Sequence, residues 1–458
     1  MRKNRTPPAA GTPPTVRVSR RIERRHDVDI CVVGGGPAGL AAAVTAARQG
    51  CRVCLVEAQN CLGGMGTAGL MPIFMAFGDD LHFYAGGFGR EVHDRLAASG
   101  ATTADRPWGQ WLPPICTEAL KRLYDDLVLD AGVELCLMTQ LVAVDAARGR
   151  VRHVVCAGKS GLFAIRARVF VDGTGDGDLA AWAGAPFEKG DADGNLMPGT
   201  LCSLWADVDW DAVRSAGQNA QEVLIRALED DPGILPQPDP HLPGMIPAGG
   251  SLAGGNVGHA FGVDGTDERS LTRAVIASRR LLPAYERFYR TRLQGYAQAR
   301  LAATAAQFGV RETRRILGDY ILVQADFERQ AVFADEIGRY NYWADLHCVR
   351  PSPEAFEAHL KRFNNQPKPG ESYGIPYRIL TPRGLDNVLV AGRCVSADRY
   401  VQASIRVMPG CFITGQAAGV AAALAVRKRT GTRGVRAPEL RRELTALGAY
   451  LPDVGDAS

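Results

Sequence analysis

Several side chains in the second half of the chain have the chemistry to bind an anionic substrate and move a proton. Arg311 and Arg315 belong to the run "VRETRR", and Arg406 belongs to "SIRVMPG". A guanidinium can hold a carboxylate through two parallel hydrogen bonds. His347, in "YWADLH", is the residue type best suited to carry a proton, because its unperturbed pKa is about 6.5. We therefore predict Arg311, Arg315, His347 and Arg406 as catalytic residues, with His259 as the second choice of histidine.

The local structure of "VRETRR" decides which of its arginines act together. On a strand, Arg311, Thr313 and Arg315 would share one face. On a helix, Arg311, Arg314 and Arg315 would cluster instead. The following "ILGDYILV" favours a strand or hairpin. The alternative is that these arginines are structural and pair with acidic neighbours such as Glu312.

A glycine turn near the start of the chain predicts the first element that would position a ligand beside these side chains. The stretch "VDICVVGGGPAGLAAAVTAARQGCRVCLVEA" predicts a strand, a helix and a second strand. Three spaced glycines at the first junction permit the tight turn, the approach of a pyrophosphate and close packing of helix on strand. Glu57 ends the second strand, where a carboxylate can accept hydrogen bonds from both ribose hydroxyls. We predict that a dinucleotide is bound by Gly34, Gly36, Pro37, Ala38, Gly39, Glu57 and Ala58.

Two further glycine-rich loops indicate that the ligand extends beyond the adenosine half. "LGGMGTAG" follows the second strand, and "VFVDGTGDGDLAAWAG" ends a later strand after a β-meander. Ligands of open α/β sheets bind outside the carboxyl ends of the strands, so both loops should meet one ligand. A domain that binds only NAD does not need the first loop, which favours FAD; an ordinary surface loop is the alternative. The predicted contacts are Gly63, Gly64, Met65, Thr67, Val142, Thr174 and Gly175.

The segment from Asn387 to Val426 repeats a strand, a glycine turn and a small-residue helix at the other end of the chain. Its helix "GCFITGQAAGVAAALAV" is apolar, but Gln416 interrupts it. We therefore predict a buried core helix and not a membrane span. A buried helix without a ligand is the alternative to one that contacts a cofactor.

Composition limits the class of protein. Residues 1–26 contain eight Lys or Arg and one Glu, a net charge of +7, so the remaining chain carries −3 of the total +4. We expect residues 1–26 to form a disordered basic tail, and we expect the acidic body not to bind nucleic acid. No apolar region follows the arginine pairs, which argues against export and membrane association. Eleven cysteines in apolar runs indicate a reduced, cytoplasmic protein, and the spacing of His, Cys and Asp predicts no metal site.

The ordered set of these motifs resembles the glutathione-reductase-like class of flavoproteins, which includes the fumarate reductases. More narrowly, "GVRETRRILGDYILVQAD", "YWADLH" and "GIPYRILTPRGLDNVLVAGRC" are similar to the family of FAD-dependent oxidoreductases. The resemblance covers about residues 27–427. In such proteins both ends of the chain fold into one FAD-binding domain, which would explain why glycine-rich junctions occur at both ends.

The resemblance also implies roles for the late segment. The strand "NVLVAGRC" and the helix after it would close over the ribityl chain and the flavin ring. A helix N-terminus at the pyrimidine edge would stabilise the anion that forms on reduction. Gly392 and Arg393 are then expected at the pyrophosphate or ribityl chain, and the residues expected to face the flavin at the start of the helix are Thr414, Gly415, Gln416 and Ala417.

The implied fold class is α/β, with a Rossmann-like FAD-binding domain of the glutathione-reductase type that is discontinuous in sequence. We expect this domain to comprise residues 27–184 and 374–430. An inserted α+β substrate or cap domain would occupy residues 185–373. Residues 431–458 are expected to form a C-terminal tail with a short helix.

The implied function is hydride transfer between flavin N5 and a small organic substrate, as a dehydrogenase or oxidase, with oxygen, NAD(P)H or another compound as electron partner. The alternatives are a flavin-dependent monooxygenase using NAD(P)H and oxygen, or an electron-transfer subunit of a complex. No CxxxxC pair follows the second glycine loop, so disulfide chemistry is not expected. No histidine adjoins that loop's paired glycines, which implies non-covalent FAD, with Cys61, Cys394 or Cys411 as alternative attachment points. The chain would act as a monomer or homodimer.

Overall fold

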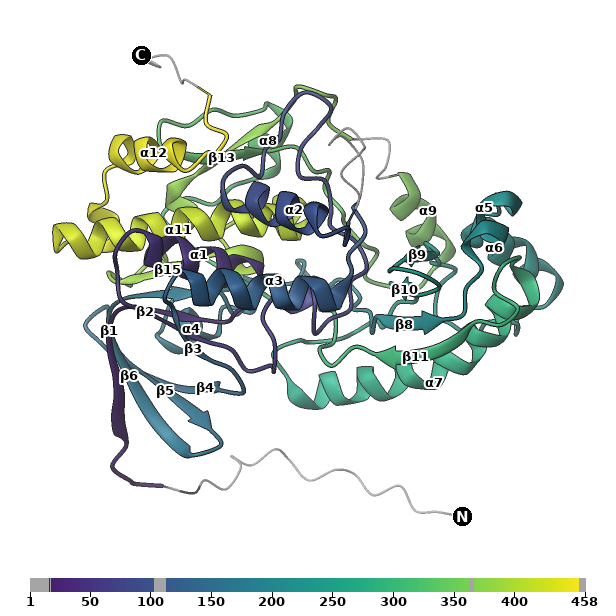
Figure 1. Ribbon diagram of the computed structural model, residues 1–458, viewed down its shortest axis with the longest axis horizontal. Helices are drawn as coiled ribbons and strands as arrows, with labels where there is room; N and C mark the ends of the chain where they lie inside the picture. Colours follow the sequence, from purple (N-terminus) through teal and green to yellow (C-terminus); the bar gives the residue numbers. More distant parts are fainter. Residues whose placement is uncertain (1–15, 17, 103–112, 362–365, 453–458) are drawn as a thin grey trace.

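A seven-stranded sheet is the largest sheet of the computed structural model, which describes residues 16, 18–102, 113–361 and 366–452 (Figure 1). The strand order is β3 (Glu134–Cys136), β2 (Val53–Val56), β1 (Glu23–Val33), β6 (Gly161–Asp172), β5 (Arg150–Gly158) and β4 (Gln140–Ala147), with β15 (Val388–Val390) beside β6. The pairs β1–β2, β2–β3, β1–β6 and β6–β15 are parallel, whereas β4–β5 and β5–β6 are antiparallel. The predicted α/β class with a parallel sheet is confirmed.

The short strand β15 brings the late glycine junction to the same sheet as the early one. Val388 pairs with Phe170 and Val390 pairs with Asp172, in parallel register. All three residues of β15 are fully buried, as expected for an apolar strand covered on both faces. The carboxyl ends of β1, β6 and β15 therefore lie at one edge of the sheet.

Two helices from opposite ends of the chain pack side by side over this sheet (Figure 1). They are α1 (Pro37–Arg48) and α11 (Met408–Lys428). A Cβ added to Gly415 would lie 2.1 Å from the carbonyl oxygen of Ala38, and one added to Gly419 would lie 2.5 Å from that of Ala42. These two glycines thus allow the backbones to touch. The other helices around the sheet are α2 (Phe88–Ala98), α3 (Thr117–Asp130), α4 (Asp178–Trp182), α10 (Arg399–Ile405) and α12 (Ala437–Ala446).

A four-stranded antiparallel sheet lies on the right-hand side of Figure 1. Its order is β11 (Arg300–Thr304), β8 (Ser203–Ala206), β10 (Ala253–Gly255) and β9 (Met245–Pro247). It has a separate hydrophobic cluster, built on Trp205, Phe288 and Tyr289. The neighbouring helices are α5 (Trp210–Ala216), α6 (Ala220–Asp230), α7 (Glu268–Arg292) and α9 (Pro353–Lys361).

Smaller elements complete the described chain. The pair β7 (Phe187–Lys189) and β12 (Arg314–Ile316) is antiparallel, as is the pair β13 (Glu336–Tyr340) and β14 (Tyr373–Pro376). The short helix α8 (Gln324–Glu328) precedes β13. The short helix expected near the C-terminus is α12.

The expectation that residues 1–26 are disordered is wrong for the last four of them, Glu23 to His26. Strand β1 starts at Glu23, which pairs with Phe163 of β6, so the residues from Glu23 to His26 are ordered in the sheet. Strand β1 extends into these polar residues because β6 offers them backbone hydrogen-bond partners beyond the buried part of the sheet. Residues 1–15 and 17 lie outside the described part of the chain.

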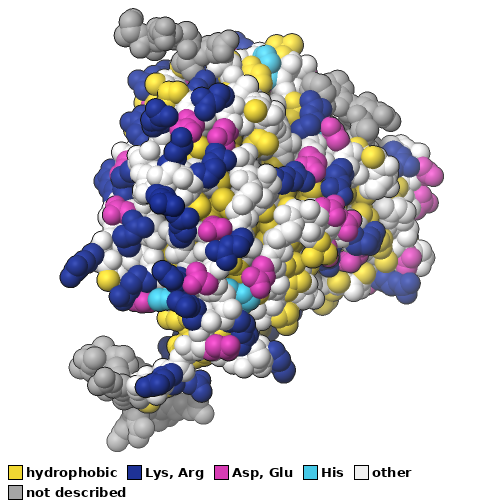
Figure 2. Space-filling view, turned by 60° about the vertical axis from the view of Figure 1, so that its left-hand side comes forward, with side chains coloured by type: hydrophobic (Ala, Val, Ile, Leu, Met, Phe, Trp, Pro, Cys, Tyr) yellow, Lys and Arg dark blue, Asp and Glu magenta, His cyan; other side chains and the backbone are white. Residues whose placement is uncertain are grey.

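Helix α11 is the predicted core helix. By length and composition it could cross a membrane, but every residue of its apolar window is buried inside the protein. Figure 2 shows the face reached by turning the left-hand side of Figure 1 forward. Lys and Arg side chains are spread over this face with Asp and Glu side chains among them, and apolar side chains lie between.

Candidate functional site

A cavity of about 670 Å³ begins at the carboxyl ends of β1, β2, β6 and β15. Its wall continues into the segments around the four-stranded sheet, which contribute Thr200, Cys202 and His241. This volume lies within the range of cofactor and small-molecule sites, about 300–1,000 Å³. The predicted site residues that line it are Gly34, Gly36, Pro37, Ala38, Glu57, Ala58, Gly64, Met65, Thr174, Gly175, Arg311, His347, Gly392, Arg393 and Arg406.

The three glycines of the first turn have different roles. Gly34 has a φ of +94°, and an added Cβ would lie 2.6 Å from the backbone of Gly173. A Cβ on Gly39 would lie 1.8 Å from the carbonyl oxygen of Gly34. By contrast, a Cβ on Gly36 would meet no described atom within 4 Å. Gly34 and Gly39 therefore serve the turn itself, whereas Gly36 leaves open space in the cavity wall.

The N-terminus of α1 borders this open space. Gly36 is its N-cap residue, no described side chain caps it, and its first turn contains no acidic residue. The first N–H groups of a helix have no intrahelical partner and carry a partial positive charge. Together with the open position at Gly36, this end of the cavity is suited to a diphosphate.

Glu57 lies at the end of β2 on the cavity wall, as the sequence predicts. Its Oε2 accepts a hydrogen bond from the backbone N–H of Gly35 at 2.6 Å, and its Oε1 accepts one from that of Gln59 at 2.7 Å. Burial raises the pKa of this carboxyl above its usual range, although the backbone donors oppose the shift. The carboxylate is thus held in one position beside the diphosphate end.

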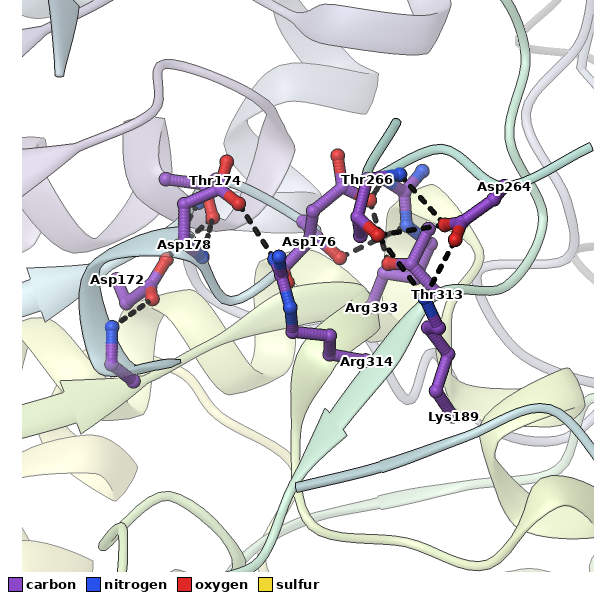
Figure 3. Close-up of polar contacts among 12 residues, drawn as sticks. Asp172, Thr174, Asp176, Asp178, Lys189, Asp264, Thr266, Thr313, Arg314 and Arg393 are labelled. Carbon is purple, nitrogen blue, oxygen red and sulfur yellow. Dashed lines mark hydrogen bonds and ion pairs between the residues drawn. The ribbon is translucent and has the colours of Figure 1, made fainter. Parts of the chain in front are cut away.

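The loop after β6 is fixed by charged contacts to Arg393 (Figure 3). The Nη2 of Arg393 lies 2.6 Å from Oδ1 of Asp176, and its Nε donates to the carbonyl oxygen of Gly175 at 3.0 Å. The hydroxyl of Thr313 donates to the same Oδ1 of Asp176 at 2.7 Å. Arg393 therefore joins the late glycine turn to the loop that holds Thr174 and Gly175 against the cavity.

Asp172 anchors the start of the same loop from a fully buried position. Its carboxylate accepts hydrogen bonds from the N–H of Thr174 at 3.0 Å, the hydroxyl of Thr174 at 2.7 Å and the N–H of Ala180 at 2.8 Å. Burial nevertheless dominates and raises the pKa of Asp172 to about 6. Ionisation of this buried carboxyl group therefore lowers the free energy of unfolding.

We expect Asp172 to make stability fall as the pH rises from about 4 to about 6. The raised pKa means that the folded state binds the proton more tightly than the unfolded state. The resulting stabilisation is fully present below the pKa that Asp172 has in the unfolded chain, and it is lost as the pH rises through about 6. The change is on the order of 3 kcal/mol. Thermal unfolding of Asp172→Asn across this range should show a flatter pH dependence than the unsubstituted protein, whereas Asp230→Asn, at an exposed position, should not. Identical slopes for the two variants would contradict this prediction.

The remaining predicted residues lie outside the set of described residues that line the cavity. Gly63 has a φ of +102° and packs against the ring of Tyr124. The hydroxyl of Thr67 donates to the carbonyl oxygen of Leu62. Both residues stabilise the second glycine loop through contacts outside the described cavity lining. Val142 is 41% exposed on β4, while its neighbour Leu141 lines the cavity; a strand turns adjacent side chains to opposite faces, so the expected position was off by one residue.

The expected start of the late helix was also wrong. Helix α11 begins at Met408, and it is Val407, Met408 and Cys411 that line the cavity. Gln416 instead accepts a hydrogen bond from the backbone N–H of Phe88 at 2.6 Å. Gly415 packs on α1. The residues that were expected at the start of the helix lie in its second and third turns instead: Thr414, Gly415, Gln416 and Ala417. Pro409 at the first turn explains the earlier start, because proline is favoured there.

The run "VRETRR" separates into one cavity residue and one structural residue. Arg311 lines the cavity and donates from Nη1 to the carbonyl oxygen of Pro198 at 2.7 Å. Arg315 lies in the strand β12 and pairs with Glu312 at 2.7 Å. The predicted strand is present, but it begins only at Arg314, so Arg311 and Arg315 do not share a face. The catalytic role expected for Arg315 is therefore replaced by the structural alternative.

A second polar group lies on the cavity wall around Asp345. The Nη2 of Arg406 donates to Oδ2 of Asp345 at 3.0 Å and to its carbonyl oxygen at 3.1 Å. The Nε2 of His347 lies 3.2 Å from the same Oδ2. The Nε of Arg406 is buried and has no hydrogen-bond partner within the part of the chain that the structure describes. Burial, with a further contribution from Arg311, lowers the pKa of His347 well below its usual value.

Several cavity residues were not predicted from the sequence. Tyr342, Trp343 and Asp345 belong to the motif "YWADLH" and line the cavity, and Met71 and Met75 contribute an apolar wall. A closer reading of that motif could have suggested Asp345, but apolar lining residues have no distinctive spacing. The structure also brings His241, His259 and His347 together, with one ligand atom of each within 4.8 Å of the others. The spacing of these residues in the sequence predicted no metal site, because the three histidines come from segments far apart in the chain.

Comparisons with known proteins give short or distant similarities. Over 47 residues the chain is 47% identical to dihydrolipoyl dehydrogenase of Manduca sexta, and over 39 residues it is 51% identical to the soluble pyridine nucleotide transhydrogenase of Chromohalobacter salexigens. These matches span 10% and 8% of the chain and the same shares of the two relatives. The matched segment thus spans only about a tenth of the length of these curated relatives.

Solved structures cover more of the chain at lower identity. A geranylgeranyl bacteriochlorophyll reductase-like protein of Thermoplasma acidophilum is 12% identical, with 92% of this chain and 83% of that chain covered and a TM-score of 0.42. The p-nitrophenol 4-monooxygenase of Pseudomonas putida is 13% identical, with 92% and 84% covered and the same TM-score of 0.42. At these scores the likeness carries no argument about the reaction.

A family match identifies the cofactor. Residues 29–444 match the family described as FAD dependent oxidoreductase, which is most of the chain. The cavity fits FAD, because Gly36 leaves room for a pyrophosphate and the uncapped N-terminus of α1 borders that space. The chain belongs to the FAD dependent oxidoreductase family and is an enzyme that uses FAD as its cofactor.

Proposed function

We propose that this enzyme transfers a hydride between FAD and a small organic substrate that carries a carboxylate. The observation that carries this proposal is that two guanidinium groups, those of Arg406 and Arg311, line the same cavity. Guanidinium groups on a cavity wall can hold a carboxylate through charge-assisted hydrogen bonds. A dehydrogenase or oxidase is the reaction class that we infer.

The residues divide into two groups by their proposed roles. The residues that would hold FAD are those around the glycine turns, including Gly36, Glu57, Thr174 and Arg393. When bound, FAD supplies the hydride chemistry, and the protein supplies orientation and charge. Arg406 and Arg311 would bind and orient the substrate carboxylate.

We propose that FAD is held without a covalent bond. Of the three cysteines considered as attachment points, Cys411 lines the cavity, whereas Cys61 and Cys394 lie outside its described lining. Burial raises the pKa of Cys411 to about 12, and its Sγ donates to the carbonyl oxygen of Arg406 at 3.1 Å. A protonated thiol is a poor nucleophile, which disfavours attachment there.

Further parts of the proposal concern organisation and partners. The FAD-binding part would be of the glutathione-reductase type, formed by residues 27–184 and 374–430. Residues 185–373 would form the inserted substrate or cap domain, consistent with the separate hydrophobic cluster around Trp205. The electron partner would be oxygen, NAD(P)H or another small compound, and the enzyme would act in the cytoplasm as a monomer or homodimer.

Substitution of Arg406 tests the proposed substrate class. A panel of small carboxylates and their amides is mixed with the flavin-loaded protein without oxygen, and loss of flavin absorbance is followed. We expect a carboxylate to reduce the flavin and Arg406→Met to raise the concentration needed for half-maximal rate about 100-fold, or about 2.7 kcal/mol. Arg378→Met, at a guanidinium paired with Asp335 outside the described lining of the cavity, serves as the control.

Three outcomes would redirect the proposal. Equal reduction by carboxylates and their amides, with no effect of Arg406→Met, would exclude the carboxylate-binding role. The second candidate is a monooxygenase using NAD(P)H and oxygen, the class named for the p-nitrophenol enzyme. It would show NAD(P)H consumption that depends on substrate, and ¹⁸O₂ would label the product. An electron-transfer subunit would turn over no small molecule without a partner protein.

A further inference from the structure

Three histidines from separate segments meet beside the FAD cavity. His241 precedes β9, His259 follows β10, and His347 follows β13. All three are buried, with 7%, 3% and 6% of their surface exposed. His241 and His347 line the cavity, so the cluster lies at its wall. A cluster of buried imidazoles at a cavity wall needs a chemical reason, since histidine is not a core-forming residue.

Two carboxylates fix the protons on the outer nitrogens of two of these rings. The Nδ1 of His259 lies 2.9 Å from Oδ2 of Asp239, and the Nε2 of His347 lies 3.2 Å from Oδ2 of Asp345. An ionised carboxylate only accepts hydrogen bonds, so each of these nitrogens carries the hydrogen. The same carboxylate-to-imidazole contact orients histidines that bind metal ions.

The inner nitrogens of the same two rings face each other. The Nε2 of His259 and the Nδ1 of His347 are 3.0 Å apart. At this distance the two nitrogens can share a proton in a hydrogen bond, or they can bind one metal ion in its place. Neutral imidazoles are the form that binds a metal.

We propose that His259, His347 and His241 bind a divalent first-row metal ion such as Zn²⁺ at the wall of the FAD cavity. Three imidazoles with an open fourth position are a donor set that suits Zn²⁺. Asp239 and Asp345 would balance the charge of the ion. The open position would face the cavity because His241 and His347 line it.

The third ring makes the site only partly preorganised. His241 is stacked on His259, with ring centroids 4.0 Å apart and an angle of 7° between the planes. Two parallel rings cannot both have one ion in their planes, so His241 must turn about its Cβ–Cγ bond to complete the site. His259 and His347, at 81° to each other, need no such change. The contribution of His241 to affinity should therefore be the smallest of the three.

This inference gives His347 a ligand role in place of the proton-transfer role expected from the sequence. It does not depend on the substrate class or on the electron partner. A bound ion next to Arg406 would add a second positive group for an anionic substrate. The inference can thus be tested without a substrate.

The test is a Co²⁺ titration of the full, FAD-loaded chain after treatment with a chelator. Co²⁺ bound by nitrogen ligands absorbs at wavelengths beyond the flavin bands. We expect one Co²⁺ per chain, displaced by Zn²⁺. His259→Gln and His347→Gln should each weaken binding about 100-fold or more, and Asp239→Asn about 10-fold to 100-fold. His153→Gln, which removes a histidine on β5, and Cys348→Ser, next to Asp239, should leave binding unchanged.

The retained FAD absorbance of each variant shows that it is folded. His259→Gln removes a buried group and could disturb the fold. His347→Gln, at the cavity wall, therefore serves as a second, independent test of the same site. The proposal is overturned if the unsubstituted chain binds no Co²⁺, or if the histidine variants bind it as well as His153→Gln. Loss of binding in Cys348→Ser would also contradict it, because the ion would then lie at the other nitrogen of His259.

Discussion

Gly36→Val should abolish FAD binding while leaving the fold intact. Gly36 has φ −66° and ψ −179°, which any residue adopts, and an added Cβ would meet no described protein atom within 4 Å. The new side chain would occupy the space where the backbone must approach the pyrophosphate. We expect affinity for FAD to fall at least about 100-fold, or about 2.7 kcal/mol. The measurement is the flavin absorbance released into the supernatant on denaturation, per mole of purified protein.

A matched glycine substitution separates this effect from a general loss of stability. Gly233→Val changes an exposed loop glycine without a left-handed backbone, and it should retain FAD fully. Thermal unfolding of the FAD-free forms should be the same for both variants. If Gly36→Val binds FAD as Gly233→Val does, the diphosphate does not lie at this turn. Flavin that stays on the denatured chain would contradict non-covalent binding.

Glu312→Met should destabilise the protein by about 3–5 kcal/mol. Glu312 is fully buried and contacts Arg315 at 2.7 Å and Arg399 at 2.9 Å. The side chain of Arg315 is only 5% exposed, so removing the carboxylate leaves a buried guanidinium without its main counter-charge. The backbone N–H of Met197 also loses its acceptor. Chemical unfolding followed by tryptophan fluorescence measures the loss.

The second acidic partner of Arg315 provides the control. Glu188 contacts the other end of the guanidinium at 3.4 Å and is 55% exposed, so Glu188→Met should cost less than about 1 kcal/mol. The double variant Glu312→Met, Arg315→Met should regain part of the loss, because it removes the more deeply buried guanidinium together with its carboxylate and leaves only Arg399, which is 23% exposed. Equal stability of Glu312→Met and Glu188→Met would show that the ion pair does not hold this part of the fold.

Much of the cofactor site could be predicted because its requirements are local. The turn after β1 needs glycines at fixed spacing, and the strand that follows needs a carboxylate at its end. Gly36 and Glu57 satisfy these needs within one βαβ unit, so short-range spacing is enough to find them. The late turn at Gly392 was found in the same way, from a strand, a glycine and a helix in order.

The roles of side chains whose orientation depends on contacts with other segments could not be predicted from the sequence. Gln416 looks like a ligand contact in sequence, yet it holds the backbone of Phe88, which lies 328 positions earlier. Arg311 and Arg315 are equivalent in the motif "VRETRR". Only the buried Glu312 and the pairing of β12 with β7 turn Arg315 away from the cavity.

The sequence by itself determined the cofactor class and the sheet that holds it, because glycine spacing and hydrophobic periodicity act over neighbouring residues. The tertiary structure alone decided the cavity wall around Arg406. Asp345, Arg406 and the histidines 241, 259 and 347 come from segments far apart in the chain, and no spacing rule relates them. Their meeting follows from how the segments around the smaller sheet fold against the carboxyl edge of the larger one.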